Sequence, residues 1–90
     1  MIKANEAKAM VKAYNEQKEA ENKAKVQKFL DEDCSTVITT AAINGRAEAF
    51  VEVPYELQEL IPMIHANLTV EGYFSQTRHG HSNTAILIRW

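Results

Sequence analysis

The chain has 90 residues, of which 46% are hydrophobic and 24% charged, so it forms at most one small domain and is too apolar for a disordered segment. Its formal net charge of −2 does not favour a nucleic-acid partner, and no apolar run is long enough to span a membrane. The first residues lack the apolar core of a signal peptide, which favours a cytoplasmic protein. A single cysteine, Cys34, excludes an intrachain disulfide and any zinc site built from several cysteines. Catalytic motifs are absent, so we expect neither an enzymatic activity nor a cofactor.

Residues 3–30 predict one long helix, because they contain no glycine or proline and are rich in Ala, Glu, Lys and Gln. Such a helix is roughly 42 Å long at about 1.5 Å per residue, whereas the rest of the chain folds into a body only about 27 Å across. The helix should therefore overhang its own domain. Met10, Val11 and Tyr14 lie on the overhang and predict a homo-oligomer interface. No heptad pattern lasts for three repeats, so a regular coiled coil is not predicted.

Charge divides the chain at nearly the same place. Residues 1–28 hold seven lysines and four glutamates, a net charge of +3, whereas the remainder holds three arginines and eight acidic residues, a net charge of −5. Lysine is a common filler of a solvated helix face, but opposite charges on neighbouring subunits would also attract each other. We therefore divide the chain into an oligomerisation arm, residues 1–30, and a small α+β domain, residues 31–90.

Residues 31–43 allow two interpretations. Apolar residues at helical spacing, followed by Asn44-Gly45 where a left-handed helix end belongs, favour a helix. The β-branched residues of segment 35–40 before an Asn-Gly turn favour a β-hairpin instead. We prefer the helix, because the apolar spacing fits a period of 3.6 better than a period of 2.

The rest of the chain predicts a small β-α-β-β body. Its expected elements are strand 47–53, helix 55–68 with a kink at Pro62, strand 73–77, a loop over 78–83 and strand 84–90. The last strand has apolar residues on both faces, which indicates the central position in the sheet. The expected fold class is therefore α+β, with one long N-terminal helix, or two, followed by a three-stranded sheet.

The segment 78–83 is the one dense cluster of varied polar groups. A guanidinium, two imidazoles, a hydroxyl, a carboxamide and a glycine suit a phosphate or a carboxylate, and Arg46 or a neighbouring lysine would complete the site. The alternative is a solvated hairpin loop. The candidate ligand-binding residues are Arg78, His79, His81, Ser82, Asn83 and Arg46.

Other chemistry is less favoured. His79 and His81 would need a third metal ligand, and no standard zinc spacing is present, so no metal site is predicted. His65 follows an apolar helix position and is expected to be half-buried and hydrogen-bonded. Cys34 lies in the apolar stripe and is expected to be a buried structural thiol rather than a nucleophile.

Residues 34–90 resemble a set of short tailed-phage proteins. The resemblance rests on Ala41-Ala42-Ile43-Asn44-Gly45, Gly72-Tyr73-Phe74 and the closing strand Ile86-Leu87-Ile88-Arg89-Trp90. The set carries no established catalytic residues. The resemblance implies an infected bacterial cytoplasm or a virion, and a role as a host-factor inhibitor, a ligand-sequestering protein or a virion accessory.

We therefore expect a non-enzymatic accessory or counter-defence protein that binds a host factor or a small nucleotide-like anion. The alternative is a structural or virion accessory protein whose partner is itself or another phage protein. A ligand-sequestering protein should have a basic pocket between subunits, whereas a structural protein should have a large apolar patch and no pocket.

Overall fold

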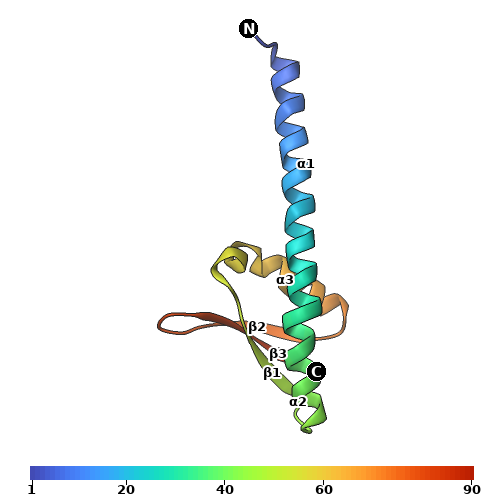
Figure 1. The fold of residues 1–90 in the computed structure, drawn as a ribbon, viewed down its shortest axis with the longest axis vertical. Coiled ribbons are helices and arrows are strands. Elements are labelled where there is room, and N and C mark those ends of the chain that lie inside the picture. Colours follow the sequence, from blue (N-terminus) through green and yellow to red (C-terminus); the bar gives the residue numbers. More distant parts are fainter.

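The computed structural model describes residues 1–90 and consists of one long helix that rises from a small helix-backed sheet (Figure 1). In chain order the elements are α1 (Ala4–Phe29), the π-helical turn η1 (Leu30–Cys34), α2 (Ser35–Ile43), β1 (Glu48–Glu52), the 3₁₀ segment η2 (Tyr55–Leu60), α3 (Ile61–Val70), β2 (Phe74–His79) and β3 (Thr84–Arg89). The sheet is antiparallel with strand order β1-β3-β2. The predicted α+β class and the central position of the last strand are confirmed.

The first three helical segments form one continuous helix, so the prediction of a helix over 31–43 is confirmed and the hairpin alternative is wrong. The helix also crosses residue 30, where we divided arm from domain. At 3.6 residues per turn Cys34 would lie roughly 80° around an α-helix from Val26. The wider π-helical turn rotates Cys34 back, and both side chains are buried in the same core.

The long helix ends where the Asn-Gly pair predicted. Gly45 has a φ of 76°, the left-handed conformation that glycine adopts most easily. The Arg46 N–H donates to the Ala41 carbonyl at 2.9 Å and the Gly45 N–H to the Ala42 carbonyl at 3.0 Å. This arrangement satisfies the last carbonyls of the helix and turns the chain into β1 beside α2.

One face of the sheet packs on the helices and the other faces solvent. Val51, Ile86 and Ile88 lie on the packed face and belong to the core. Phe50 and Leu87 lie on the open face. Phe50 is exposed, but Leu87 is buried, because the central strand has neighbours on both sides.

Two boundaries differ from the sequence-based expectation. The loop predicted over 78–83 is wrong at its start, because Arg78 and His79 pair with Ala85 and Thr84 and so extend β2. The helix predicted over 55–68 is a 3₁₀ segment followed by an α-helix, so the change comes before Pro62 and the predicted kink at this residue is wrong. Pro62 lies in the first turn of α3, where its missing N–H breaks no helical hydrogen bond.

Candidate functional site

The predicted anion-binding residues do not converge. Arg78 and His79 are successive residues of β2, so their side chains project from opposite faces of the sheet. Arg78 shares the open face with Ala85, its partner in the ladder, and with Glu52, which pairs with the other side of Ala85. His79 faces the opposite side, where Nδ1 lies 3.4 Å from the Thr84 hydroxyl.

The connection between β2 and β3 is held by two hydrogen bonds of Asn83. The Asn83 side-chain amide donates to the Glu52 carboxylate at 3.0 Å, and the Asn83 carbonyl accepts from the Gly80 N–H at 2.8 Å. His81 and Ser82 are exposed at the tip and have no side-chain hydrogen bond. Because Glu52 places a negative charge beside the connection, this geometry does not favour an anion there.

Arg46 lies at the other end of the sheet. It precedes β1, whereas the hairpin connection contacts Glu52 at the far end of that strand. Six extended residues span roughly 20 Å at about 3.3 Å per residue. Arg46 therefore does not complete a site with segment 78–83 of its own chain.

His65 connects α3 to β2. Its Nδ1 lies 2.5 Å from the Ser75 hydroxyl and its Nε2 lies 2.7 Å from the Thr77 hydroxyl. The expected half-buried, hydrogen-bonded histidine is confirmed. In a catalytic triad one histidine nitrogen faces a hydroxyl and the other faces a carboxylate. Both ring nitrogens of His65 face hydroxyls, so we assign His65 a structural role.

Cys34 is buried, with 1% of its surface exposed. Burial, assisted by the charge of Asp33, raises the pKa of the thiol from 9.0 to about 12. The thiol is therefore protonated at neutral pH, which agrees with the predicted structural role. No three His, Cys, Asp or Glu side chains come together as metal ligands.

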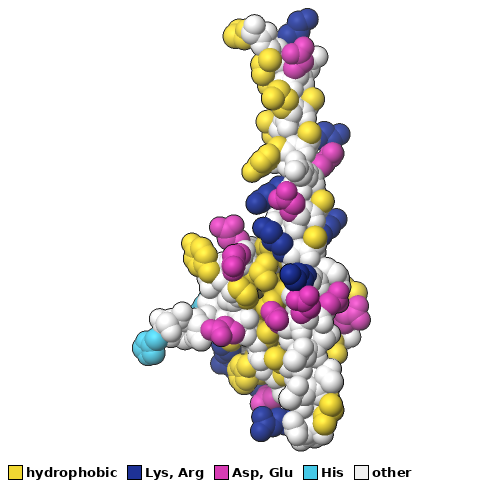
Figure 2. All heavy atoms as spheres, viewed as in Figure 1, with side chains coloured by type: hydrophobic (Ala, Val, Ile, Leu, Met, Phe, Trp, Pro, Cys, Tyr) yellow, Lys and Arg dark blue, Asp and Glu magenta, His cyan; other side chains and the backbone are white.

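α1 projects far beyond the body (Figures 1 and 2), and its first half carries the predicted interface residues. Met10, Val11 and Tyr14 are 64%, 60% and 65% exposed, and Val26 is the first buried residue of the helix. The molecule measures 63 × 29 × 18 Å. The expected overhang is confirmed, and its apolar side chains contact no other part of the chain.

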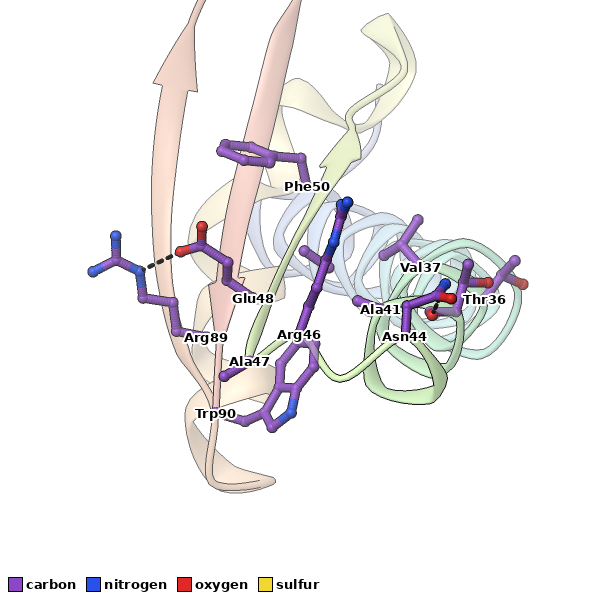
Figure 3. A pocket seen from close by; sticks show the side chains of 12 residues that line it. Thr36, Val37, Ala41, Asn44, Arg46, Ala47, Glu48, Phe50, Arg89 and Trp90 are labelled. Atoms are coloured by element: carbon purple, nitrogen blue, oxygen red, sulfur yellow. Dashed lines mark hydrogen bonds and ion pairs between the residues drawn. The ribbon is translucent and has the colours of Figure 1, made fainter.

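A groove that the sequence did not predict lies between α2 and the open edge of β1 (Figure 3). Its volume is about 850 Å³, and its lining includes Val37 and Ala41 from α2, Ala49 and Phe50 from β1, and Arg46 beside them. The sequence offered one indication of this groove, a predicted helix followed by a strand with glutamates on one face. That indication depends on residues 31–43 forming a helix, because a hairpin would leave no helix beside the strand.

No family model, curated protein or solved structure matches the chain. The resemblance to short tailed-phage proteins therefore stays an expectation. None of the helices is both long and apolar enough to cross a bilayer. The projecting arm is the surface of the molecule that bears most directly on function.

Proposed function

We propose that the protein is a non-enzymatic accessory protein that acts by protein–protein assembly, and that its first partner is a second copy bound through α1. The observation that supports this is the exposure of Met10, Val11 and Tyr14 on a helix that its own body leaves uncovered. Single exposed apolar residues are common on protein surfaces. Three large ones within five residues of an otherwise polar helix are typical of a contact surface.

The pattern of the arm favours an antiparallel pair. Ala4, Ala7, Val11 and Tyr14 follow the alternating three- and four-residue spacing of two heptads. In an antiparallel pair centred on residue 9, Ala4 of one copy faces Tyr14 of the other, and Ala7 faces Val11. Every layer then combines a small side chain with a large one. A parallel pair would oppose alanine to alanine near the tip and leave gaps.

Electrostatics distinguish this pairing from contact between an arm and a neighbouring body. Residues 1–28 carry a net charge of +3, so two arms repel each other weakly, and added salt should strengthen their association. Contact between the positive arm and the negative body should weaken with salt. The apolar surface of the arm favours the first arrangement.

The assembly role is favoured over sequestration of a small anion, because Arg78 and His79 face opposite sides of β2 and Arg46 lies at the far end of β1. In the tailed-phage setting that the resemblance implies, arm-mediated assembly suits a virion accessory. It also suits a multivalent inhibitor of a host protein, because linked copies bind with avidity.

Disulfide trapping tests both the pairing and its direction. Ala7→Cys and Val11→Cys are made separately in a Cys34→Ala background and oxidised alone or mixed. Antiparallel pairing predicts a crosslinked dimer chiefly in the mixture, where the two positions face each other. The matched control is Ala9→Cys on the outer side of the arm. Crosslinking no greater than this control would contradict the proposal, and strong crosslinking of each variant alone would show parallel arms.

A further inference from the structure

The outer edge of β1 presents unpaired backbone groups. The Val53 N–H donates to the Thr84 carbonyl at 2.9 Å, and the Trp90 N–H donates to the Ala47 carbonyl at 3.1 Å. Bonds between two antiparallel strands fall on every second residue, so the bonds from β1 to β3 come from residues 47, 49, 51 and 53. The N–H and C=O groups of Glu48, Phe50 and Glu52 therefore point away from the sheet.

This edge faces the groove of about 850 Å³ beside α2. Figure 3 shows the Arg46 side chain along the groove, between β1 and the helix. An extended segment in this position would extend the β-ladder through the outward groups of β1. Its alternate side chains would contact Val37 and Ala41 of α2. Strand addition to a sheet edge beside a helix is an established way to bind a peptide.

The side chains along the edge define the charge pattern of the occupant. Glu48 is already paired with Arg89 at 3.1 Å, whereas Arg46 takes part in neither ion pair of the structure. Glu52 accepts a hydrogen bond from the neutral amide of Asn83, so its charge is not compensated. A matching antiparallel segment has a basic residue opposite Glu52, an apolar residue opposite Phe50 and an acidic residue opposite Arg46.

We propose that the open edge of β1 binds an extended peptide of another protein by strand addition, with a basic residue, an apolar residue two positions later and an acidic residue four positions after that. A second copy fits less well. Its β1 is flanked by its own α2, which would have to enter the groove with the strand. Pairing two β1 strands about Phe50 would also oppose Glu48 to Glu52, and like charges in that position are destabilising.

The probe is a fluorophore-labelled peptide, Lys-Val-Phe-Val-Thr-Val-Glu, titrated with the full chain by fluorescence anisotropy. Its phenylalanine and threonine amides should donate to β1, so N-methylation of these two amides should weaken binding about tenfold or more. N-methylation of the intervening valine amides is the matched control and should change binding little. Equal binding of the two methylated peptides, or no binding of the unmodified one, would overturn the proposal.

Variants of the protein give a second readout. Phe50→Pro removes the outward N–H and keeps the ladder to β3, whereas Phe50→Ala removes the same side chain and keeps the N–H. The proline variant should bind the peptide several-fold more weakly than the alanine variant. Arg46→Glu should lose affinity, and a peptide ending in lysine should restore it. Equal affinity of the two Phe50 variants, or a failed restoration, would contradict strand addition.

Occupancy by a second copy has its own signature. Slow hydrogen exchange of the Phe50 N–H in the peptide-free protein would show that the edge is already paired, and would contradict the assignment to a foreign peptide. The inference is independent of the arm. Val11→Ser should leave peptide affinity unchanged even where it abolishes self-association.

Discussion

Tyr14 and Val26 lie on the same helix, about 18 Å apart at 1.5 Å per residue, and Tyr14 is 65% exposed whereas Val26 is 2% exposed. Only the end of α1 contributes to the core, through Val26 and Phe29, and the first half of the helix projects from the body. A helix of polar residues this long gains little stability by itself, because most helical stability in proteins comes from packing. The difference between the two residues is the basis for assigning assembly to the arm.

Cys34 should make stability depend on alkaline pH. Its pKa is about 12 in the folded protein and near the ordinary 9.0 when unfolded. Above pH 9 the unfolded chain loses this proton first, so the folded state loses about 1.4 kcal/mol of stability per pH unit until the folded pKa is reached. Guanidinium denaturation at pH 8 and pH 10 should show this loss in the wild type and a smaller loss in Cys34→Ala. Equal losses would show that the thiol titrates freely.

His65 should contribute to stability through its two hydroxyl partners. His65→Leu leaves the hydroxyls of Ser75 and Thr77 without the ring and should cost about 1–3 kcal/mol in urea denaturation. The control is Ser75→Ala in both backgrounds. If the histidine bridge forms, the double variant should be more stable than the sum of the two single losses implies. Additive losses would contradict the bridge.

Gly45 should be sensitive to any side chain for a purely conformational reason. Its φ is 76°, and an added Cβ would meet nothing within 4 Å, so Gly45→Ala should cost about 1 kcal/mol through the left-handed backbone alone. Gly45→Asn should cost less, because asparagine tolerates this conformation better. Thermal melts of the three proteins test the order. An alanine variant as stable as the wild type would contradict the described helix end.

Much of the fold could be predicted because local patterns and the final contacts agree. The alternating burial around Val51 and the glycine at the end of α2 follow directly from residue type. The π-helical turn could not be predicted, because nothing in Leu30–Cys34 requires it until Val26 and Cys34 must reach one core. Similarly, Arg78 becomes part of a strand only through its ladder partner Ala85.

The candidate surfaces were predictable to different degrees. Exposure of Tyr14 follows from comparing the length of a helix with the width of a domain, so it needed no tertiary contacts. Whether Arg78, His79 and Arg46 converge could be judged only from the strand register. The register places them apart. The groove beside β1 needed the position of α2 against the strand edge, and the sequence predicts that helix but not where it packs.

Salt should strengthen self-association. Both arms carry net positive charge, so raising the salt concentration screens their repulsion and leaves the apolar contact intact. The dimer fraction, followed by light scattering at a fixed protein concentration, should rise between low and moderate salt. A fall would indicate that the arm of one copy binds the acidic body of the next.

Sedimentation velocity of the full chain at micromolar concentrations tests whether two copies associate through α1. We expect a reversible, elongated dimer, because the apolar tips of two projecting helices overlap. Tyr14→Ser and Val11→Ser should each weaken it by about tenfold or more, since each removes a side chain worth more than 1 kcal/mol when buried. Gln17→Ser, on the polar part of the same arm, is the matched control. A wild-type chain that sediments as a monomer at every concentration, or a dimer unaffected by both arm variants, would rule out assembly through the arm.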